Sequence, residues 1–130
     1  MKNKGFTLLE LLVVIGIIAI LISLVSVSYS NAQKSSRDAR RKQDLSIIQS
    51  AMEQYYTQND YTYPDSTQCG STTGGNSCSA LSSYVQGGVP TDPMNSGSYV
   101  YLYTTDADGT TYSVTATLEK GGTVTINNLQ

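Results

Sequence analysis

The chain has 130 residues, the size of one ordinary domain, and only 14% of them are charged. The charges are unevenly placed: residues 1–42 carry seven of the eight Lys and Arg, and residues 43–130 carry eight of the ten Asp and Glu. There is no His, the usual general base at neutral pH. The two cysteines are too few for a Cys-only structural zinc site. We therefore expect a protein that is not an enzyme.

A long apolar segment opens the chain, and no charged residue occurs from Leu11 to Gln33. A helix over residues 6–28 would be about 34 Å long, enough to cross a hydrocarbon core of ~30 Å. Lys2 and Lys4 precede the segment, so a cleaved secretory signal peptide is the alternative. The run is longer than such a peptide needs and merges into a helical pattern. We predict a membrane-spanning helix.

One carboxylate, Glu10, stands at the edge of this apolar helix, where an unpaired charge is costly. In an isolated monomer it could instead lie solvated at the level of the lipid headgroups. The residues around it read Lys4-Gly5-Phe6-Thr7-Leu8-Leu9-Glu10 and are followed by the apolar run. Over residues 1 to about 28 this resembles the prepilin signature of the type IV pilin and pseudopilin superfamily.

The resemblance implies a processing site and an assembly residue. Residues 1–5 would be a leader that a prepilin peptidase removes after Gly5, and Phe6 would become the N-methylated N-terminus. Glu10 would pair with the N-terminal amine of a neighbouring subunit during assembly, because a carboxylate one helical turn along is the natural partner of that charge. Many relatives have a proline near the position of Val27, but the first proline here is Pro64. Melting of the helix on assembly is therefore left open.

The orientation of the span is predicted differently by two criteria. More bases follow the span than precede it, so the positive-inside rule would place the C-terminal part in the cytoplasm. The resemblance implies the reverse, with the N-terminus cytoplasmic in the inner membrane and the head extracytoplasmic. We adopt the second orientation, because the later bases begin six residues past the apolar run and alternate with acids, and because the cysteine pair suits an oxidising compartment.

The helical pattern continues beyond the membrane segment, which we place at residues 6–33, into an amphipathic part at residues 34–60. Ile48, Met52 and Tyr55 form one face, and Pro64 marks a stop just beyond the helix. Asp38 is spaced to pair with Arg41 or Lys42, and Arg40 with Asp44, as on a helix surface. We interpret the basic cluster at residues 37–42 as a solvated helix surface and subunit-contact rim. Binding to anionic lipid or DNA is the alternative.

Residues 61–130 are predicted to form a small extracytoplasmic head. Cys69 and Cys78 flank a Gly-rich spacer, and we favour a disulfide over two free thiols. Alternating patterns at residues 99–103 and 111–119, with a third strand at 124–126, predict an antiparallel β-meander. Asp108-Gly109 and Gly121-Gly122 supply the turns. The expected fold class is α+β: a long N-terminal helix whose second half packs on a three-stranded sheet.

Three acids of the head are candidate metal ligands, namely Asp92, Asp106 and Asp108. Loop carboxylates suit calcium, and the Pro-x-Asp-Pro stretch before a Tyr-rich strand resembles the calcium-binding major pseudopilins of type II secretion. The alternative is an ordinary hairpin turn at Asp-x-Asp-Gly. No nucleophile–base pair is evident, so no catalytic residue is predicted.

Three functions remain open. We favour a membrane-stored subunit that polymerises into a type II secretion-like pseudopilus, on the short head, the mid-chain cysteines and the Pro-x-Asp-Pro stretch. The second is a type IV pilus or competence fibre for adhesion, motility or DNA uptake, although the acidic head argues against direct nucleic-acid binding. The third is a monomeric membrane-anchored binding domain. The expected partners are copies of the chain, the prepilin peptidase, an inner-membrane assembly platform, minor pseudopilins and lipid.

Overall fold

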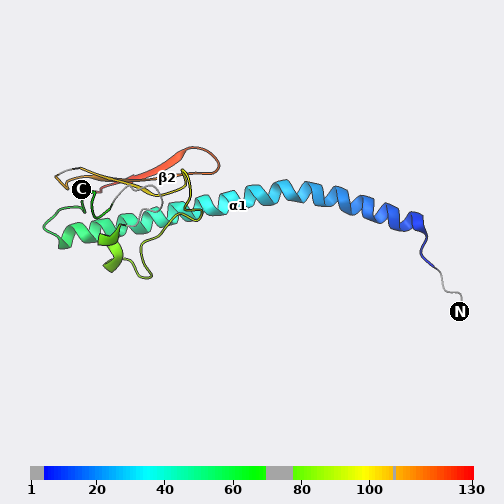
Figure 1. Ribbon diagram of the computed structural model, residues 1–130, viewed down its shortest axis with the longest axis horizontal. Helices are drawn as coiled ribbons and strands as arrows, with labels where there is room; N and C mark the ends of the chain where they lie inside the picture. The colour runs from blue at the N-terminus through cyan, green and yellow to red at the C-terminus, as the bar shows by residue number, and fades with distance from the viewer. Residues whose placement is uncertain (1–4, 70–77, 107) are drawn as a thin grey trace. The chain divides into compact units, whose positions relative to one another are not determined.

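The computed structural model describes residues 5–69, 78–106 and 108–130 (Figure 1). Its elements are helix α1 (Leu8–Gln58), the short 3-10 helix η1 (Ser79–Ser83), and strands β1 (Leu102–Thr105), β2 (Tyr112–Thr117) and β3 (Thr123–Asn127). One long helix and a three-stranded antiparallel sheet confirm the predicted α+β fold. The chain divides into two compact units, residues 1–34 and residues 35–130, which we describe separately.

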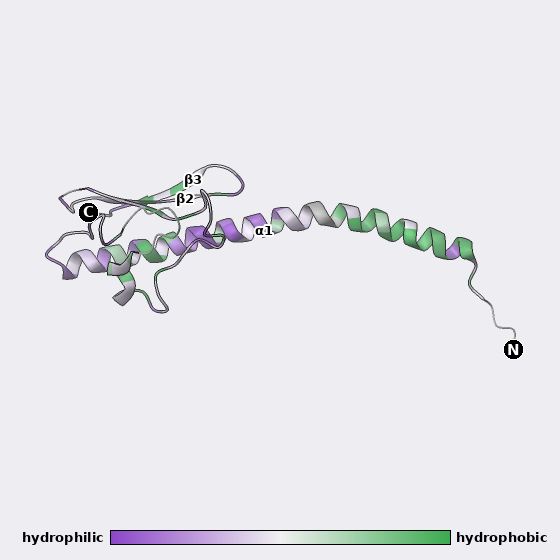
Figure 2. Ribbon diagram, in the orientation of Figure 1, coloured by the Kyte–Doolittle hydropathy of each residue, from purple (hydrophilic) through white to green (hydrophobic). Residues whose placement is uncertain are grey.

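The first unit consists mainly of the apolar part of α1, a helix long and apolar enough to cross a membrane. No proline interrupts the 51 residues of α1, and Gly16 is its only glycine. The large apolar side chains from Phe6 to Leu24 are all exposed. Figure 2 shows the hydrophobic residues gathered along this part of α1. An apolar surface of this kind requires a lipid or protein environment, because water solvates it poorly.

The second half of α1 supplies one wall of the core in the second unit. Leu45, Ile48, Ala51 and Met52 are each at most 1% exposed, and their spacing of three and four residues defines a single helix face. This confirms the predicted face, to which Tyr55 contributes as a partly buried neighbour.

The helix ends before the proline that was predicted to mark its stop. Its last residue is Gln58, and Asp60 and Tyr61 take left-handed conformations with φ of 51° and 58°. The Tyr61 amide donates to the Tyr56 carbonyl at 3.1 Å. Pro64 lies buried further along the turn. The chain is thus reversed by two left-handed residues, an ordinary way to end a helix.

The sheet has the order β1-β2-β3, with both pairs antiparallel, so it is the predicted meander (Figure 1). Val114 at its centre is paired with Tyr103 on β1 and Ile126 on β3. Tyr112, Val114 and Ala116 are buried, as their alternation predicted. Leu118 lies beyond the end of β2 and is only half-buried.

The first predicted strand was placed too early. Residues 99–103 were expected to form it, but β1 begins at Leu102, and Tyr99 instead forms an isolated bridge with Ser96 across a turn in which Gly97 has a φ of 60°. The Arg41 guanidinium carbon lies 5.0 Å from the centroid of the Tyr99 ring. Tyr101 and Tyr103 do share the buried face.

Residues 65–69 and 78–90 form the described parts of the connection between the turn after α1 and the loop before β1. It contains η1, whose Leu81 is fully buried in the head core. Cys69 and Cys78 are joined by a disulfide, as predicted, and both are buried in the same core. Apolar anchors at three points therefore fix this segment to α1.

Candidate functional site

The residues that the sequence assigned to processing, Gly5 and Phe6, lie just before α1, and the assembly residue Glu10 lies in its first turn. Glu10 accepts hydrogen bonds from the Thr7 amide and the Thr7 hydroxyl, both at 2.9 Å, and the Glu10 amide donates to the Thr7 hydroxyl oxygen at 3.2 Å. This reciprocal pattern is a capping box, with Thr7 at the N-cap and Glu10 at the third helical position. In the single chain, Glu10 therefore caps its own helix.

The capping box bears on the predicted pairing of Glu10 with a neighbouring amine. Glu10 lies one turn from Phe6, and its carboxylate is held toward the N-terminal end of the helix by Thr7. The contact with a second copy stays a prediction. Sequence reasoning missed the cap, although Thr-x-x-Glu before an apolar run is its ordinary signature.

The second unit contains a buried cluster of charges centred on Arg41, whose side chain is fully buried. Its guanidinium donates to both carboxylate oxygens of Asp92, at 2.6 and 3.0 Å. It also donates to Asp38 at 2.8 Å and to Glu119 at 2.9 Å. These acids come from α1, from the loop before β1 and from the turn after β2. One guanidinium thus ties three parts of the head together.

The acids of this cluster are held in their charged forms. Hydrogen bonds from Arg37, at 2.6 and 2.7 Å, and from Arg41 lower the pKa of Glu119 to about 2. Burial acts to raise the pKa of Asp38, but donation by the backbone amides of Glu119 and Lys120 and by Arg41 outweighs it, so the pKa is lowered. The Asp92 carboxylate raises the pKa of Arg41 further above its ordinary value.

This cluster corrects our interpretation of residues 37–42 as a solvated basic surface. Arg41 is fully buried and Arg37 is about one-third exposed, because acids of the head neutralise both. Only Arg40 and Lys42 remain exposed. Arg40 lies 3.8 Å from Asp44, the predicted pair, and Asp44 accepts a hydrogen bond from Tyr101 at 2.7 Å. The Asp38–Arg41 pair was predicted from its spacing; Asp92 and Glu119 gave no such signal.

The three candidate calcium ligands each have a separate place. Asp92 is engaged by Arg41 and by the Met94 amide, whereas Asp106 caps its own turn through the hydroxyl and amide groups of Thr110 and Thr111. The Thr110 hydroxyl is the main reason that the pKa of Asp106 falls to about 2. Asp108 is exposed. Within the described parts of the chain, no three His, Cys, Asp or Glu side chains are grouped as metal ligands would be.

Calcium binding therefore stays a prediction, and the thermal midpoint of the head tests it. Asp92 and Asp106 already accept hydrogen bonds within the chain, and an equal midpoint in millimolar calcium and in an excess of chelator would contradict the prediction. A midpoint that rises with calcium and falls back with chelator would show that these loops rearrange around a cation.

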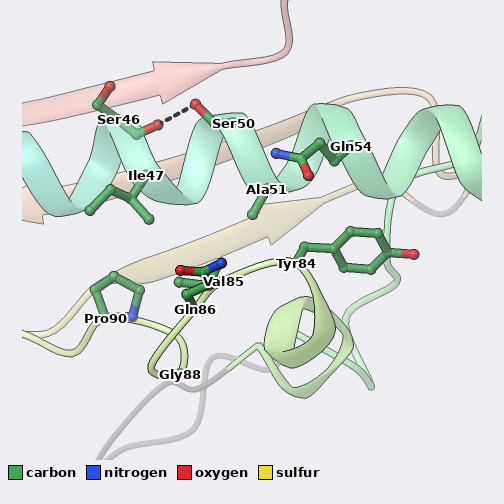
Figure 3. Close-up of a pocket in the computed structure, with 10 residues that line it drawn as sticks. All are labelled: Ser46, Ile47, Ser50, Ala51, Gln54, Tyr84, Val85, Gln86, Gly88 and Pro90. Atoms are coloured by element: carbon green, nitrogen blue, oxygen red, sulfur yellow. Dashed lines mark hydrogen bonds between the residues drawn. The ribbon is translucent and has the colours of Figure 1, made fainter.

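A shallow groove of about 410 Å³ runs between α1 and the segment after η1 (Figure 3). Ile47 and Ala51 on α1 face Val85 and Pro90 across it. None of the described residues that line this groove is charged. It offers apolar, amide and hydroxyl contacts, but no His, Asp, Glu or Lys among these lining residues stands beside Ser46 or Ser50 as a general base.

The chain was compared with known families and proteins. Residues 1–26 match the prokaryotic N-terminal methylation motif. The chain is also 30% identical over 59 residues to the type IV major pilin protein PilA of Myxococcus xanthus (strain DK1622). That alignment covers 45% of this chain and 27% of the relative, so the chain matches about a quarter of the length of that protein. No solved structure matches significantly.

The long helix, the three-stranded sheet and these two matches support a place in the type IV pilin superfamily, whose members are structural subunits. The chain is therefore similar to type IV pilins, and its residues 1–26 match the N-terminal methylation motif. The matches do not separate a pilin from a pseudopilin.

Proposed function

We propose that the chain is a structural subunit that is cut after Gly5, N-methylated at Phe6, stored in the membrane and polymerised into an extracytoplasmic fibre. One observation carries this proposal: the large apolar side chains of α1 from Leu8 to Leu24 are all exposed, and a single carboxylate, Glu10, stands near the start of the helix. Lipid covers such a surface in the stored subunit, and the same surfaces of other copies cover it in a fibre. The methylation motif over residues 1–26 supports the processing step.

The role of Glu10 is tested by separating its charge from its cap. Glu10→Ala removes both the carboxylate and the capping box, whereas Thr7→Ala removes the cap and keeps the carboxylate. If the charge pairs with the amine of Phe6 on the next copy, Glu10→Ala is cleaved normally but yields no fibre. Thr7→Ala then still assembles, with a helix start weakened by about 1 kcal/mol.

Electron microscopy of sheared cells and the size of the processed chain give the two readouts. Normal fibres from Glu10→Ala would contradict the pairing role. Loss of fibres from both variants would assign Glu10 to capping alone. A wild-type chain that is not shortened by the prepilin peptidase would contradict the whole proposal and favour a monomeric membrane-anchored binding domain.

For the kind of fibre, we propose a type II secretion-like pseudopilus assembled with minor pseudopilins on an inner-membrane platform. The disulfide in the middle of the chain and the loop around Asp92 support it. A type IV pilus is the second candidate, supported by the name of the Myxococcus xanthus relative. Deleting the gene separates them. A pseudopilus mutant retains secreted enzymes inside the cell, whereas a pilus mutant loses its surface fibres and secretes normally.

The proposed orientation places the N-terminus in the cytoplasm and the head outside. The disulfide between Cys69 and Cys78 supports this, because such bonds persist in oxidising compartments. A reporter that is active only outside the cytoplasm, fused after Gln130, tests the orientation. Activity in the cytoplasm alone would reverse it.

A further inference from the structure

The exposed charges of residues 35–130 are sorted by sign to the two ends of α1's second half. At the end where this unit begins, the exposed bases are Arg40 and Lys42 on α1 and Lys120 on the turn after β2. The acids beside them are turned inward and neutralised, since Asp38, Asp44 and Asp92 are buried and the Glu119 side chain is 7% exposed. We call Arg40, Lys42 and Lys120 the basic end.

The opposite end carries exposed acids without any base. Asp60 and Asp65 flank the turn that follows α1, and the Asp108-Gly109 turn rests on it, with the Tyr63 amide donating to the Gly109 carbonyl at 2.8 Å. No Lys or Arg occurs anywhere between Gln43 and Glu119. We call Asp60, Asp65 and Asp108 the acidic end. Lys42 and Gln58 are sixteen positions apart along the helix, so the two ends are about 24 Å apart.

The basic end is also hollowed. A groove of about 290 Å³ is lined by Lys42 and Lys120, with the side chains of Ala39 and Leu118 supplying apolar contact. Asp38 also lines this groove, but it is buried and accepts hydrogen bonds from Arg41 and from the Glu119 and Lys120 amides. Asp108 at the acidic end is exposed. The exposed charges at the two ends of the same unit are therefore opposite in sign.

We propose that the acidic end of one copy docks against the basic end of the next. The inference rests on the proposed function, because it names the contact that the heads make in the fibre. A contact between two different ends of identical subunits is heterologous, and its repetition gives an open helical array when the rotation between copies does not close a ring. An anionic membrane would satisfy the basic end alone, whereas a second copy satisfies both ends.

Charge reversal and charge-conserving replacement of the same residues form a matched pair of variants. Lys42→Glu with Lys120→Glu places acids opposite the acidic end of the neighbour. Lys42→Arg with Lys120→Arg keeps the charge. We expect sheared fibre to fall about tenfold or more in the first variant and to stay unchanged in the second. The double variant Asp60→Asn with Asp108→Lys should lower the amount of sheared fibre similarly. Asn is chosen at position 60 because Asp60 has a left-handed backbone, with a φ of 51°, which Asn also adopts.

Zero-length carbodiimide coupling of fibres gives a second, independent readout, because it joins a lysine amine to a carboxylate in direct contact. The two ends are too far apart to couple within one copy, so products between Lys42 or Lys120 and the three acids must join copies. We expect a ladder of oligomers on a denaturing gel, and its loss in the charge-conserving variant, since guanidinium does not couple. Near-UV circular dichroism of the purified full-length variants in detergent confirms that the heads are folded.

Three outcomes would overturn the proposal. Normal amounts of fibre from the charge-reversed variant would leave the proposed function standing and refute this contact. A charge-reversed chain that instead loses binding to anionic vesicles, with no coupled oligomers in the wild type, would assign the basic end to lipid. A wild-type chain that forms no fibre in cells with the prepilin peptidase would refute both the contact and the proposed function.

Discussion

Replacement of Arg41 by Met is expected to destabilise the head more than any other single charge deletion. The guanidinium is fully buried and makes four hydrogen bonds to three carboxylates. Methionine fills most of its volume but leaves Asp38 and Asp92 buried without this partner. Removal of one partner from a buried ion pair costs about 3–5 kcal/mol, which is a large part of the 5–15 kcal/mol stability of an ordinary domain.

The assay is urea denaturation of the full-length chain in detergent, followed by near-UV circular dichroism, because the buried tyrosines report the packing of the head. Arg40→Met is the matched control. Arg40 lies one residue away, is 67% exposed and approaches Asp44 only at 3.8 Å, so we expect a change within about 0.5 kcal/mol.

A double-mutant cycle with Asp92→Asn isolates the strongest pair of the cluster. We expect a coupling energy between Arg41 and Asp92 of about 1–3 kcal/mol, because the two side chains share two short hydrogen bonds in a buried place. If the free energies of unfolding of Arg41→Met and Arg40→Met were both within about 1 kcal/mol of the wild type, the buried cluster would not have the stabilising role given to it here.

Three further changes address acid, redox and polar contributions to the head. The pKa of Glu119 is lowered from 4.5 to about 2, so the stabilisation from its ion pairs is complete above about pH 4.5 and is lost as the pH falls toward 2. In urea melts, Glu119→Gln should reduce the loss of unfolding free energy over this pH range. The same loss in the variant and the wild type would contradict the pairing. Replacing Cys69 and Cys78 together by Ser should cost about 2–3 kcal/mol in the same melts, and the variant should no longer respond to reductant; a wild type insensitive to reduction would oppose this. Tyr103 has a buried hydroxyl with no hydrogen-bond partner among the described residues, so Tyr103→Phe should leave the unfolding free energy unchanged or raise it by up to about 1 kcal/mol. Tyr101→Phe loses the hydrogen bond to Asp44 and should lower the unfolding free energy. The reverse order of the two variants would contradict these hydrogen-bond assignments.

Much of the fold could be predicted because its signals are local. The face through Ile48 and Met52 repeats with the helical period, and Tyr112 to Ala116 alternates as a strand does. The Asp108-Gly109 and Gly121-Gly122 turns followed from residues that tolerate left-handed backbone; Gly109, Gly121 and Gly122 all have positive φ.

The charge cluster could not be predicted because its signals are distant in sequence. Arg41 looks like any base on a solvated helix until Asp92 and Glu119 are brought to it, and neither position has a periodicity that points to α1. Tyr99, which the alternation placed in the first strand, lies over Arg41 and bridges Ser96 across a turn instead. These partners are also distant from the local pattern or outside it.

The Arg41 cluster also has a kinetic consequence. Each strand of the sheet pairs with its neighbour in the chain, so the meander can form early, and α1 needs only local hydrogen bonds. Arg41, in contrast, reaches Asp92 across 51 residues and Glu119 across 78. Contacts that close such long loops form slowly and late. Loss of the cluster is therefore expected to raise the unfolding rate of the head more than it lowers the folding rate.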